Sequence, residues 1–389
     1  MKQVKSQTTQ KSPFWYFLLI LIFLRPALDI TSSWAFYFNR SLPPLNPGAL
    51  VGILVFLFSF FYVLKNIDKI LKAPLFWPIL TFLGLTGISV LYAPEQMTGL
   101  GEFIRLSTIW LLYFSAYLLC QSKKDFFIIL KVILLSYFIP ALVGVIQLLT
   151  GQGLPDGFGS FNRIFGTFAH PNLFAFYSIL ILGILIALVF SKTISLFFKN
   201  TFNYRLLAWL VVGLVIVLVL ATYTRSALFC LMLFILFFGL LRYRSLLLLG
   251  AATFLIAFLF FPAFQERLYD LISLDPHGSV VWRFRLWQDM LPLLSWHPWF
   301  GSGLESFMHL NEFYRGIKFG SLEAHNDYLK ILLENGLAGL LAFIWLIGGL
   351  FYWLIKTTRK IEPAYKNLGL GLIMICLALF LASSLDNVL

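Results

Sequence analysis

The sequence has few charged residues, and this scarcity decides its broad class. Only 12% of the 389 residues are charged, whereas 60% are hydrophobic. Soluble globular domains usually have about a quarter of their residues charged. A soluble chain could not cover this much apolar surface. The composition therefore excludes a soluble multidomain protein and predicts that residues 1–389 form a single integral membrane domain in a lipid bilayer.

Cysteine and histidine are also scarce, which limits the chemistry of the chain. The three cysteines, Cys120, Cys230 and Cys376, lie in apolar runs, and their spacing fits neither a disulfide framework nor a metal site. They are interpreted as small buried hydrophobic residues. The five histidines are scattered, without a His-x-x-x-His pair. Because Walker, dinucleotide-binding and nucleophile-elbow motifs are missing too, the sequence predicts no metal and no cofactor.

Apolar segments of about 20 residues, the length needed to cross a bilayer, recur along the chain. They predict an all-α polytopic membrane protein with about 11–12 transmembrane helices, the segments being 14–38, 49–64, 75–92, 103–120, 126–149, 168–190, 206–223, 226–241, 245–264, 329–355 and 366–385. The first apolar run follows three lysines, as in a signal peptide. It ends at Arg25 and Pro26 rather than at the small residues of a cleavage site, so we expect 14–38 to remain as an uncleaved span.

The net charge of +12 would suit nucleic-acid binding, but the positions of the charges indicate membrane topology instead. Lysines concentrate in alternate short loops, as the positive-inside rule predicts for cytoplasmic loops. The sequence therefore predicts a cytoplasmic N-terminus and no nucleic-acid partner. The basic residues of the opposite, outward side are mostly arginines: Arg40, Arg163, Arg225, Arg267, Arg283, Arg285 and Arg315. Arginine grips phosphate bidentately, although ordinary solvated surface charges remain the alternative.

The longest polar stretch, 265–328, alternates charged residues with tryptophans. This composition is typical of the membrane–water interface, and the loop orientation predicts one large extracytoplasmic helical loop. Within it, an apolar stripe predicts a helix along the interface over 280–294, formed by Trp287, Met290, Leu291 and Leu294. Further along, Gly301 and Gly303 could present backbone N–H groups to an anion, although such a pair alone is a weak motif.

Polar residues also stand at the ends of predicted spans. The turn between 206–223 and 226–241 is so short that Arg225 must lie within a residue or two of the bilayer, where a charge is costly and commonly functional. Snorkelling to the outer headgroups is the alternative. His170 and Asn172 flank Pro171, which suits the first turn of a helix. They either bind a ligand there or cap the helix, and both interpretations remain open.

The polar groups on the outward side suit one kind of reaction. Arginines stabilise the charge of a diphosphate leaving group. His325, at the start of the predicted span 329–355, has a side chain suited to removing a proton from an attacking hydroxyl. Together they indicate glycosyl transfer from a lipid-linked pyrophosphate sugar without a metal. For any single histidine, a structural hydrogen bond remains the alternative.

Local patterns at matching order and spacing resemble the O-antigen ligase/polymerase family. They are Arg163–Asn172 (RIFGTFAHPN), Thr224–Ala227 (TRSA), Arg283–Trp287 (RFRLW) followed by His297–Gly303 (HPWFGSG), Ala324–Leu329 (AHNDYL) with Glu334–Gly336 (ENG), and the closing Ser384–Asp386 (SLD). The likeness covers about residues 160–389. The preceding 150 residues resemble the family as a hydropathy profile.

The resemblance implies a fold, a reaction and a site. It implies a GT-C-like membrane glycosyltransferase of the bacterial inner membrane, with its active site on the extracytoplasmic face. The donor would be an undecaprenyl-pyrophosphate-linked glycan, and the acceptor lipid A core or a growing glycan, as in O-antigen ligases and surface-polysaccharide polymerases. Arg225, Arg283 and His325 match the catalytic residues of the family. Further candidates for substrate binding are Arg163, His170, Asn172, Arg285 and Asn326, and Arg285 is a near rival of Arg283.

The alternative function is a membrane transporter or flippase of an anionic lipid-linked glycan. A transporter should carry ionisable groups at mid-membrane and an internal repeat. The two halves of this sequence are not alike, and the polar residues cluster near the outer edge. A non-catalytic membrane subunit is a third reading, against which the concentration of arginines and histidine argues.

Overall fold

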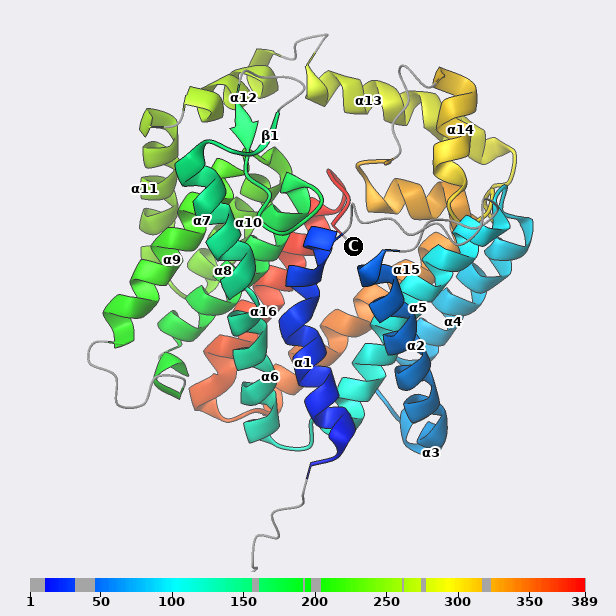
Figure 1. Cartoon of the computed structure of the whole chain (residues 1–389), viewed down its shortest axis with the longest axis horizontal. Helices are drawn as coiled ribbons and strands as arrows, with labels where there is room; N and C mark the ends of the chain where they lie inside the picture. Colours follow the sequence, from blue (N-terminus) through cyan, green and yellow to red (C-terminus); the bar gives the residue numbers. More distant parts are fainter. Residues whose placement is uncertain are drawn as a thin grey trace, which may run out of the picture.

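The computed structural model describes residues 11–31, 46–155, 161–191, 193–196, 204–260, 262–273, 278–316 and 323–388. Over these ranges the chain is almost entirely helical (Figure 1). The helices are α1 (Pro13–Leu28), α2 (Pro47–Lys65), α3 (Ile67–Ile70), α4 (Phe76–Ser89), α5 (Gln96–Leu119), α6 (Lys123–Ser136), α7 (Phe138–Thr150), α8 (Pro171–Phe190), α9 (Tyr204–Ala221), α10 (Arg225–Leu241), α11 (Ser245–Phe260), α12 (Pro262–Ser273), α13 (Ser279–Met290), α14 (Ser306–Arg315), α15 (Asp327–Lys360) and α16 (Pro363–Ala382). Two short strands, β1 (Leu154–Pro155) and β2 (Asn162–Arg163), pair antiparallel.

Among the described residues, seven helices are long and apolar enough to cross a membrane. They are Pro13–Thr31, Pro47–Lys65, Gln96–Leu119, Lys123–Thr150, Pro171–Phe190, Asp327–Lys360 and Pro363–Ala382. Four shorter apolar helices, Phe76–Tyr92, Leu206–Ala221, Arg225–Leu241 and Ser245–Phe260, fall between them. These seven and four coincide in order with the segments predicted from the sequence. The prediction of an all-α polytopic membrane protein is thus confirmed.

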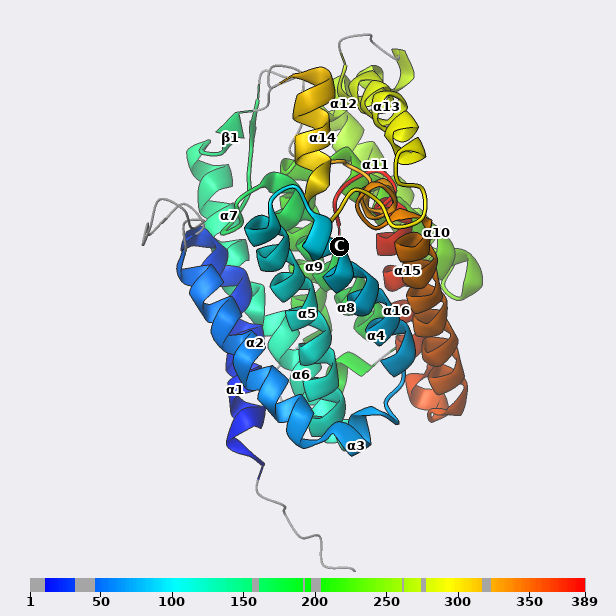
Figure 2. The same ribbon diagram turned by 90° about the vertical axis from the view of Figure 1, so that its right-hand side faces the viewer.

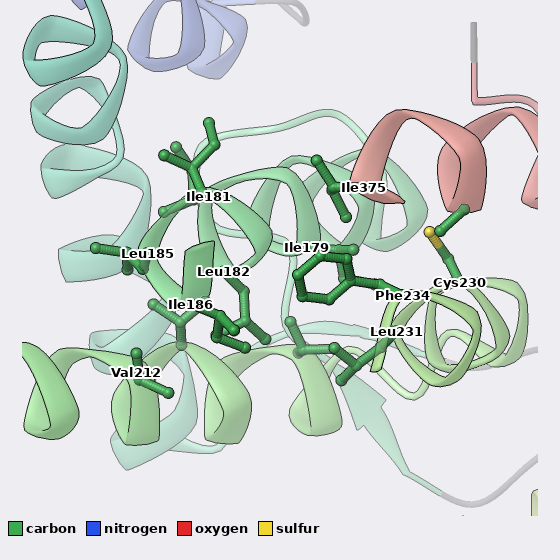
Figure 3. Close-up of a cluster of buried hydrophobic side chains, with 14 of the residues drawn as sticks. Ile179, Ile181, Leu182, Leu185, Ile186, Val212, Cys230, Leu231, Phe234 and Ile375 are labelled. Carbon is green, nitrogen blue, oxygen red and sulfur yellow. The ribbon is translucent and has the colours of Figure 1, made fainter. Parts of the chain in front are cut away.

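Helix α8 forms the centre of the larger hydrophobic core. In the most apolar 18-residue stretch of this helix, 72% of the residues are buried inside the protein, as expected for a helix that is hydrophobic all round. Leu182 is completely buried and packs in one cluster with Phe234 of α10 and Ile375 of α16 (Figure 3). The completely buried Phe174 belongs to the same cluster. Cys230 also lies in this cluster as a buried free thiol, in agreement with its interpretation as a small buried hydrophobic residue. Cys120 and Cys376 are free but only partly buried.

Helices α12, α13 and α14 lie together at one end of the bundle, across the ends of the long helices (Figures 1 and 2). The C-terminal segment 383–388 lies between α13 and the bundle (Figure 1). Lys123, at the start of α6, pairs with Glu362 before α16 at the opposite end. We call the end carrying α12–α14 the capped end.

The predicted apolar stripe of α13 is displaced by the way the helix ends. Leu286 and Met290 are completely buried, and Leu293 is nearly so, but Leu291 is 47% exposed. Leu291 therefore does not share the inward direction of Met290, although the sequence places both on one stripe. The chain tightens into a 3₁₀ helix at Leu291–Ser295, which has three residues per turn, so the inward direction moves to Leu293.

Helix α15 is broken near its start and held there by a backbone clamp. Gly336 has φ 67° and ψ −169° inside the helix, a conformation that favours glycine. The segment His297–Gly303 runs along this break, with the N–H of Ser302 donating to the carbonyl of Leu333 at 2.9 Å and the N–H of Leu337 donating to the carbonyl of Pro298 at 2.9 Å.

The glycines of this clamp allow two backbones to approach each other. A Cβ added to Gly301 would lie 2.4 Å from the carbonyl carbon of Glu334. The N–H groups of Gly301 and Gly303 donate to the carbonyls of His297 and Glu334, at 2.9 and 3.0 Å. The proposal that these two N–H groups face an anion was therefore wrong, because the backbone of the clamp occupies them.

Replacing Gly336 by alanine is expected to destabilise the capped end. The added Cβ would lie 2.3 Å from the carbonyl carbon of Trp299, and the positive φ alone costs an L-residue about 1–3 kcal/mol. Thermal unfolding in detergent should show a clear decrease in melting temperature. Gly348→Ala in the same helix is the matched control, because its Cβ meets nothing within 4 Å. Equal stability of the two variants would contradict the clamp.

We expect the capped end to face away from the cytoplasm, following the lysine bias of the loops. Gln288 on α13 and Lys124 at the opposite end are both exposed. In a variant without the native cysteines, Gln288→Cys should react with an impermeant thiol reagent in intact cells whose outer membrane, if present, is permeabilised. Lys124→Cys should react only after lysis of the inner membrane. The reverse pattern would refute this orientation.

Candidate functional site

The carboxylate of Asp386 connects the polar groups of the capped end. It is 2% exposed and lies in the segment after α16. Its Oδ2 accepts hydrogen bonds from Ser226 Oγ at 2.5 Å and from Asn172 Nδ2 at 2.8 Å. Its Oδ1 lies 3.1 Å from Nδ1 of His325, and a terminal nitrogen of Arg283 lies 3.6 Å from Oδ2. Four segments distant in sequence therefore converge on one side chain.

The surroundings keep Asp386 ionised. Burial alone would raise the pKa of its carboxyl, but the His325 hydrogen bond, the positive charge of Arg283 and the Ser226 hydroxyl hold that pKa well below its usual range. A low folded-state pKa means that the stability from these contacts is complete above about pH 4 and is lost only as the pH falls toward the lower folded-state value. At neutral pH the carboxylate therefore accepts hydrogen bonds and donates none.

This carboxylate determines which nitrogen of His325 can act as a base. Because ionised Oδ1 only accepts, the proton of a neutral imidazole lies on Nδ1, and the lone pair lies on Nε2. The side chain of His325 is 22% exposed, and its ring meets the Trp282 ring edge-on, with centroids 5.8 Å apart. The arrangement gives an oriented imidazole whose second nitrogen can accept a proton.

The backbone at His325 is constrained. Its φ is +51°, a conformation that costs a residue with a Cβ about 1–3 kcal/mol and persists only where the surroundings impose it. Two contacts do so: the N–H of Asp327 donates to the carbonyl of Ser383 at 2.9 Å, and the N–H of Val388 donates to Asp327 Oδ2 at 2.9 Å. The structure places Asn326 as the N-cap of α15, where its side chain accepts from the N–H of Leu329 at 3.0 Å.

Two arginines lie on the other side of Asp386. Arg225 is the first residue of α10, as the short turn predicted. Arg283 comes from α13 and donates to the carbonyl of Leu385 at 2.6 Å. Burial lowers the pKa of the Arg283 guanidinium; Asp386 opposes this change, and the nearby charge of Arg225 adds to it. Two cations held this close in a partly buried place favour an anion between them.

The two arginines stand at the wall of an apolar cavity of about 750 Å³. Its walls come from α10, α11, α12 and α13, with residues such as Phe229, Met232 and Phe254. Among the described residues that line it, Arg225 and Arg283 are the charged ones. The cavity therefore joins a long apolar surface to a cationic end that adjoins Asp386.

The structure places Arg163 behind the site rather than in the cavity wall. Its guanidinium donates to the carbonyl of Thr222 at 2.8 Å, to Thr224 Oγ1 at 2.9 Å and to Asn172 Oδ1 at 2.7 Å. Thr222 and Thr224 belong to the turn that carries Arg225, and Asn172 binds Asp386. Arg163 thus supports both the turn before α10 and the carboxylate that orients the histidine.

His170 is placed as the N-cap of α8. Its Nδ1 accepts a hydrogen bond from the N–H of Asn172 at 3.2 Å, which supports the capping interpretation that the sequence left open. Burial lowers the pKa of His170, and the charge of Arg163 adds to this decrease, in keeping with a neutral ring that accepts. The side chain of Asn172 is 9% exposed and is used in holding Asp386.

The structure distinguishes Arg283 from its rival. Arg285 is exposed on α13, whereas Arg283 contacts the C-terminal segment. No role for Asp386 or Ser226 followed from the sequence. The signal for Asp386 was a single acid just after the last apolar span, 61 residues beyond His325, within a closing motif to which no function was assigned.

Over the described residues, no group of three or more His, Cys, Asp or Glu side chains could hold a metal ion.

Comparisons with known proteins agree with the geometry. No curated protein matches the sequence. The family model described as O-antigen ligase matches residues 208–344, which run from α9 into α15 and include Arg225, Arg283 and His325. This match confirms the resemblance seen in the motifs and implies glycosyltransferase-type activity in general. Over this region the chain is therefore similar to the O-antigen ligase family.

Proposed function

We propose that the protein transfers a glycan from undecaprenyl pyrophosphate to an acceptor hydroxyl on the extracytoplasmic face of the bacterial inner membrane. The observation that carries this proposal is the position of Arg225 and Arg283, which stand at the cationic end of an apolar cavity and beside the Asp386–His325 pair. Such a site matches a substrate whose long hydrocarbon chain ends in a pyrophosphate next to the reacting sugar carbon.

The arginines would hold the pyrophosphate. Guanidinium groups match its oxygens in bidentate geometry, and their charge stabilises the leaving group as the bond to the sugar breaks. In the same pose, the prenyl chain would lie along the apolar walls of α10 and α11. We expect the positive charges of Arg225 and Arg283 to serve where other transferases use a metal ion, so that EDTA leaves the rate unchanged.

His325 would act as the general base. Its Nε2 takes the proton of the acceptor hydroxyl while that oxygen bonds to the anomeric carbon of the donor sugar. The bond from this carbon to the pyrophosphate oxygen breaks, and undecaprenyl pyrophosphate leaves with its electron pair. Asp386 holds the imidazole and stabilises its charge once protonated. The acceptor would be either lipid A core, as for a ligase, or a growing glycan, as for a polymerase.

Transfer in proteoliposomes tests the proposal. Purified protein, a labelled undecaprenyl-pyrophosphate-linked glycan and either acceptor are incubated with EDTA, and products are identified by mass. We expect a new glycosidic bond and one free undecaprenyl pyrophosphate per transfer. Movement of intact donor across the bilayer without bond formation, with either acceptor present, would refute a transferase and favour a flippase.

A further inference from the structure

A second cluster of charged side chains lies at the capped end, away from the arginines of the cavity. Helix α5 contributes Glu102 and Arg105, whose side chains form an ion pair, with Arg105 Nε donating to Glu102 Oε2 at 2.6 Å. Lys330 of α15 donates to Glu305, which precedes α14, at 2.7 Å. The charges of Glu305 and Glu323 also act on Arg105. We call these five residues the α5–α15 charged surface.

The location of this surface is unusual for a purely structural ion-pair network. Lys330 is the fourth residue of α15, and Glu102 and Arg105 are the seventh and tenth residues of α5. Both helices are long and apolar enough to cross a membrane, and ionisable groups carried by such helices often serve a function. The side chain of Arg105 is 56% exposed even though it pairs with Glu102. The charges of Glu305, which precedes α14, and of Glu323, which precedes α15, both act on this guanidinium.

The surface adjoins the candidate base. Glu323 lies two residues before His325, and its Oε2 accepts a hydrogen bond from Asn387 Nδ2 at 2.7 Å. The backbone N–H of Asn387 donates to Asp386 Oδ1 at 3.0 Å, the same oxygen that holds His325. One short path of hydrogen bonds thus connects the charged surface to the histidine.

The charged surface and the apolar cavity approach the histidine from different directions. Helices α5 and α10 lie on opposite sides of the C-terminal segment in both views (Figures 1 and 2). Transfer between two substrates requires such a separation, because the acceptor oxygen attacks the anomeric carbon from the side away from the leaving pyrophosphate when the displacement is in line.

We propose that the α5–α15 charged surface is the acceptor subsite and binds the hydroxyl-rich end of the acceptor glycan; this inference rests on the proposed function. Carboxylates accept hydrogen bonds from sugar hydroxyls, and arginine and lysine donate to them. Three carboxylates and two cations nearly balance, which suits a neutral or weakly charged sugar rather than a pyrophosphate. Arg105 and Glu323 contact the sugar, and Glu102, Glu305 and Lys330 position them.

Kinetics with both substrates varied test this assignment. Arg105→Gln and Glu323→Gln should each raise the KM for the acceptor about 10–100-fold, the effect of losing one charged hydrogen bond. The KM for the donor and the equilibrium binding of the donor should stay within about twofold of wild type. The assay is run with a lipid-anchored core glycan and with a free glycan as acceptor. If the sugar itself is recognised, the substitutions should raise the KM for the two acceptors by the same factor.

Lys123→Ala provides a matched control, because it removes a cation from an exposed ion pair at the opposite end of the bundle. It should change neither KM. Arg105→Lys, which can still pair with Glu102, should be intermediate. Wild-type transfer with an unchanged acceptor KM in both glutamine variants overturns the acceptor subsite alone. A raised acceptor KM accompanied by weaker donor binding and a lower melting temperature assigns the surface a structural role. Absence of transfer by the wild-type protein overturns the proposed function as well.

Discussion

Replacing His325 by glutamine is expected to decrease the rate of glycan transfer about 10²–10⁴-fold, the usual contribution of a general base. Glutamine has nearly the size of histidine and can donate to Asp386, so the fold should persist. Its amide cannot accept a proton from the acceptor hydroxyl. Donor binding should change little, because the arginines come from other helices. Single-turnover rates and donor binding, measured on the same preparation, separate the two effects.

A companion substitution distinguishes a base from a positioning residue. Asp386→Asn leaves His325 in place but can present an N–H where the carboxylate accepted, so the imidazole would lose its orientation. We expect a large decrease in rate with unchanged donor binding. The double variant should be little worse than His325→Gln alone, because both residues serve one step. An active His325→Gln enzyme would leave His325 as a positioning residue only.

Lysine in place of Arg225 or Arg283 is expected to impair transfer about 10²–10³-fold, the typical effect of losing one group that stabilises transition-state charge. Lysine keeps the charge but lacks the planar fork that binds two phosphate oxygens. Arg283→Lys should be the more harmful of the two, because Arg283 also holds the carbonyl of Leu385 at 2.6 Å. Rates at saturating donor, together with binding of undecaprenyl pyrophosphate, measure both losses.

The control for these variants lies at the other end of α10. Arg242 caps its C-terminus and donates to Asn367 at 2.8 Å, far from Arg225 at the first residue. Arg242→Lys should transfer at the wild-type rate. Near-normal activity of both Arg225→Lys and Arg283→Lys, at normal expression, would show that the pyrophosphate is held elsewhere.

The sequence predicted the spans because hydropathy is a local property. It placed Arg225 correctly because the turn before α10 leaves the chain no freedom. Arg283 and Arg285 could not be separated, since the choice depends on how α13 is rotated about its axis against the C-terminal segment. Only tertiary packing determines that rotation. The break at Gly336 was also hidden, because a glycine inside an apolar run looks the same in a straight helix.

Asp386 shows most clearly what could not be predicted from the sequence. Nothing near it in sequence indicates a partner, because Asn172, Ser226 and His325 reach it from α8, α10 and the start of α15. In the structure, the orienting carboxylate comes from beyond two membrane-length helices, α15 and α16, along the chain.

The shared carboxylate also determines how substitutions will combine. Asn172, Ser226 and Arg283 lie on three separate helices, yet each interacts with Oδ2 of Asp386. Groups that share one partner do not contribute independently. Double-mutant cycles among these three residues should therefore yield interaction energies of about 0.5–3 kcal/mol instead of additive changes. In a family tree of such enzymes, substitutions at these positions would be expected to arise together rather than one at a time.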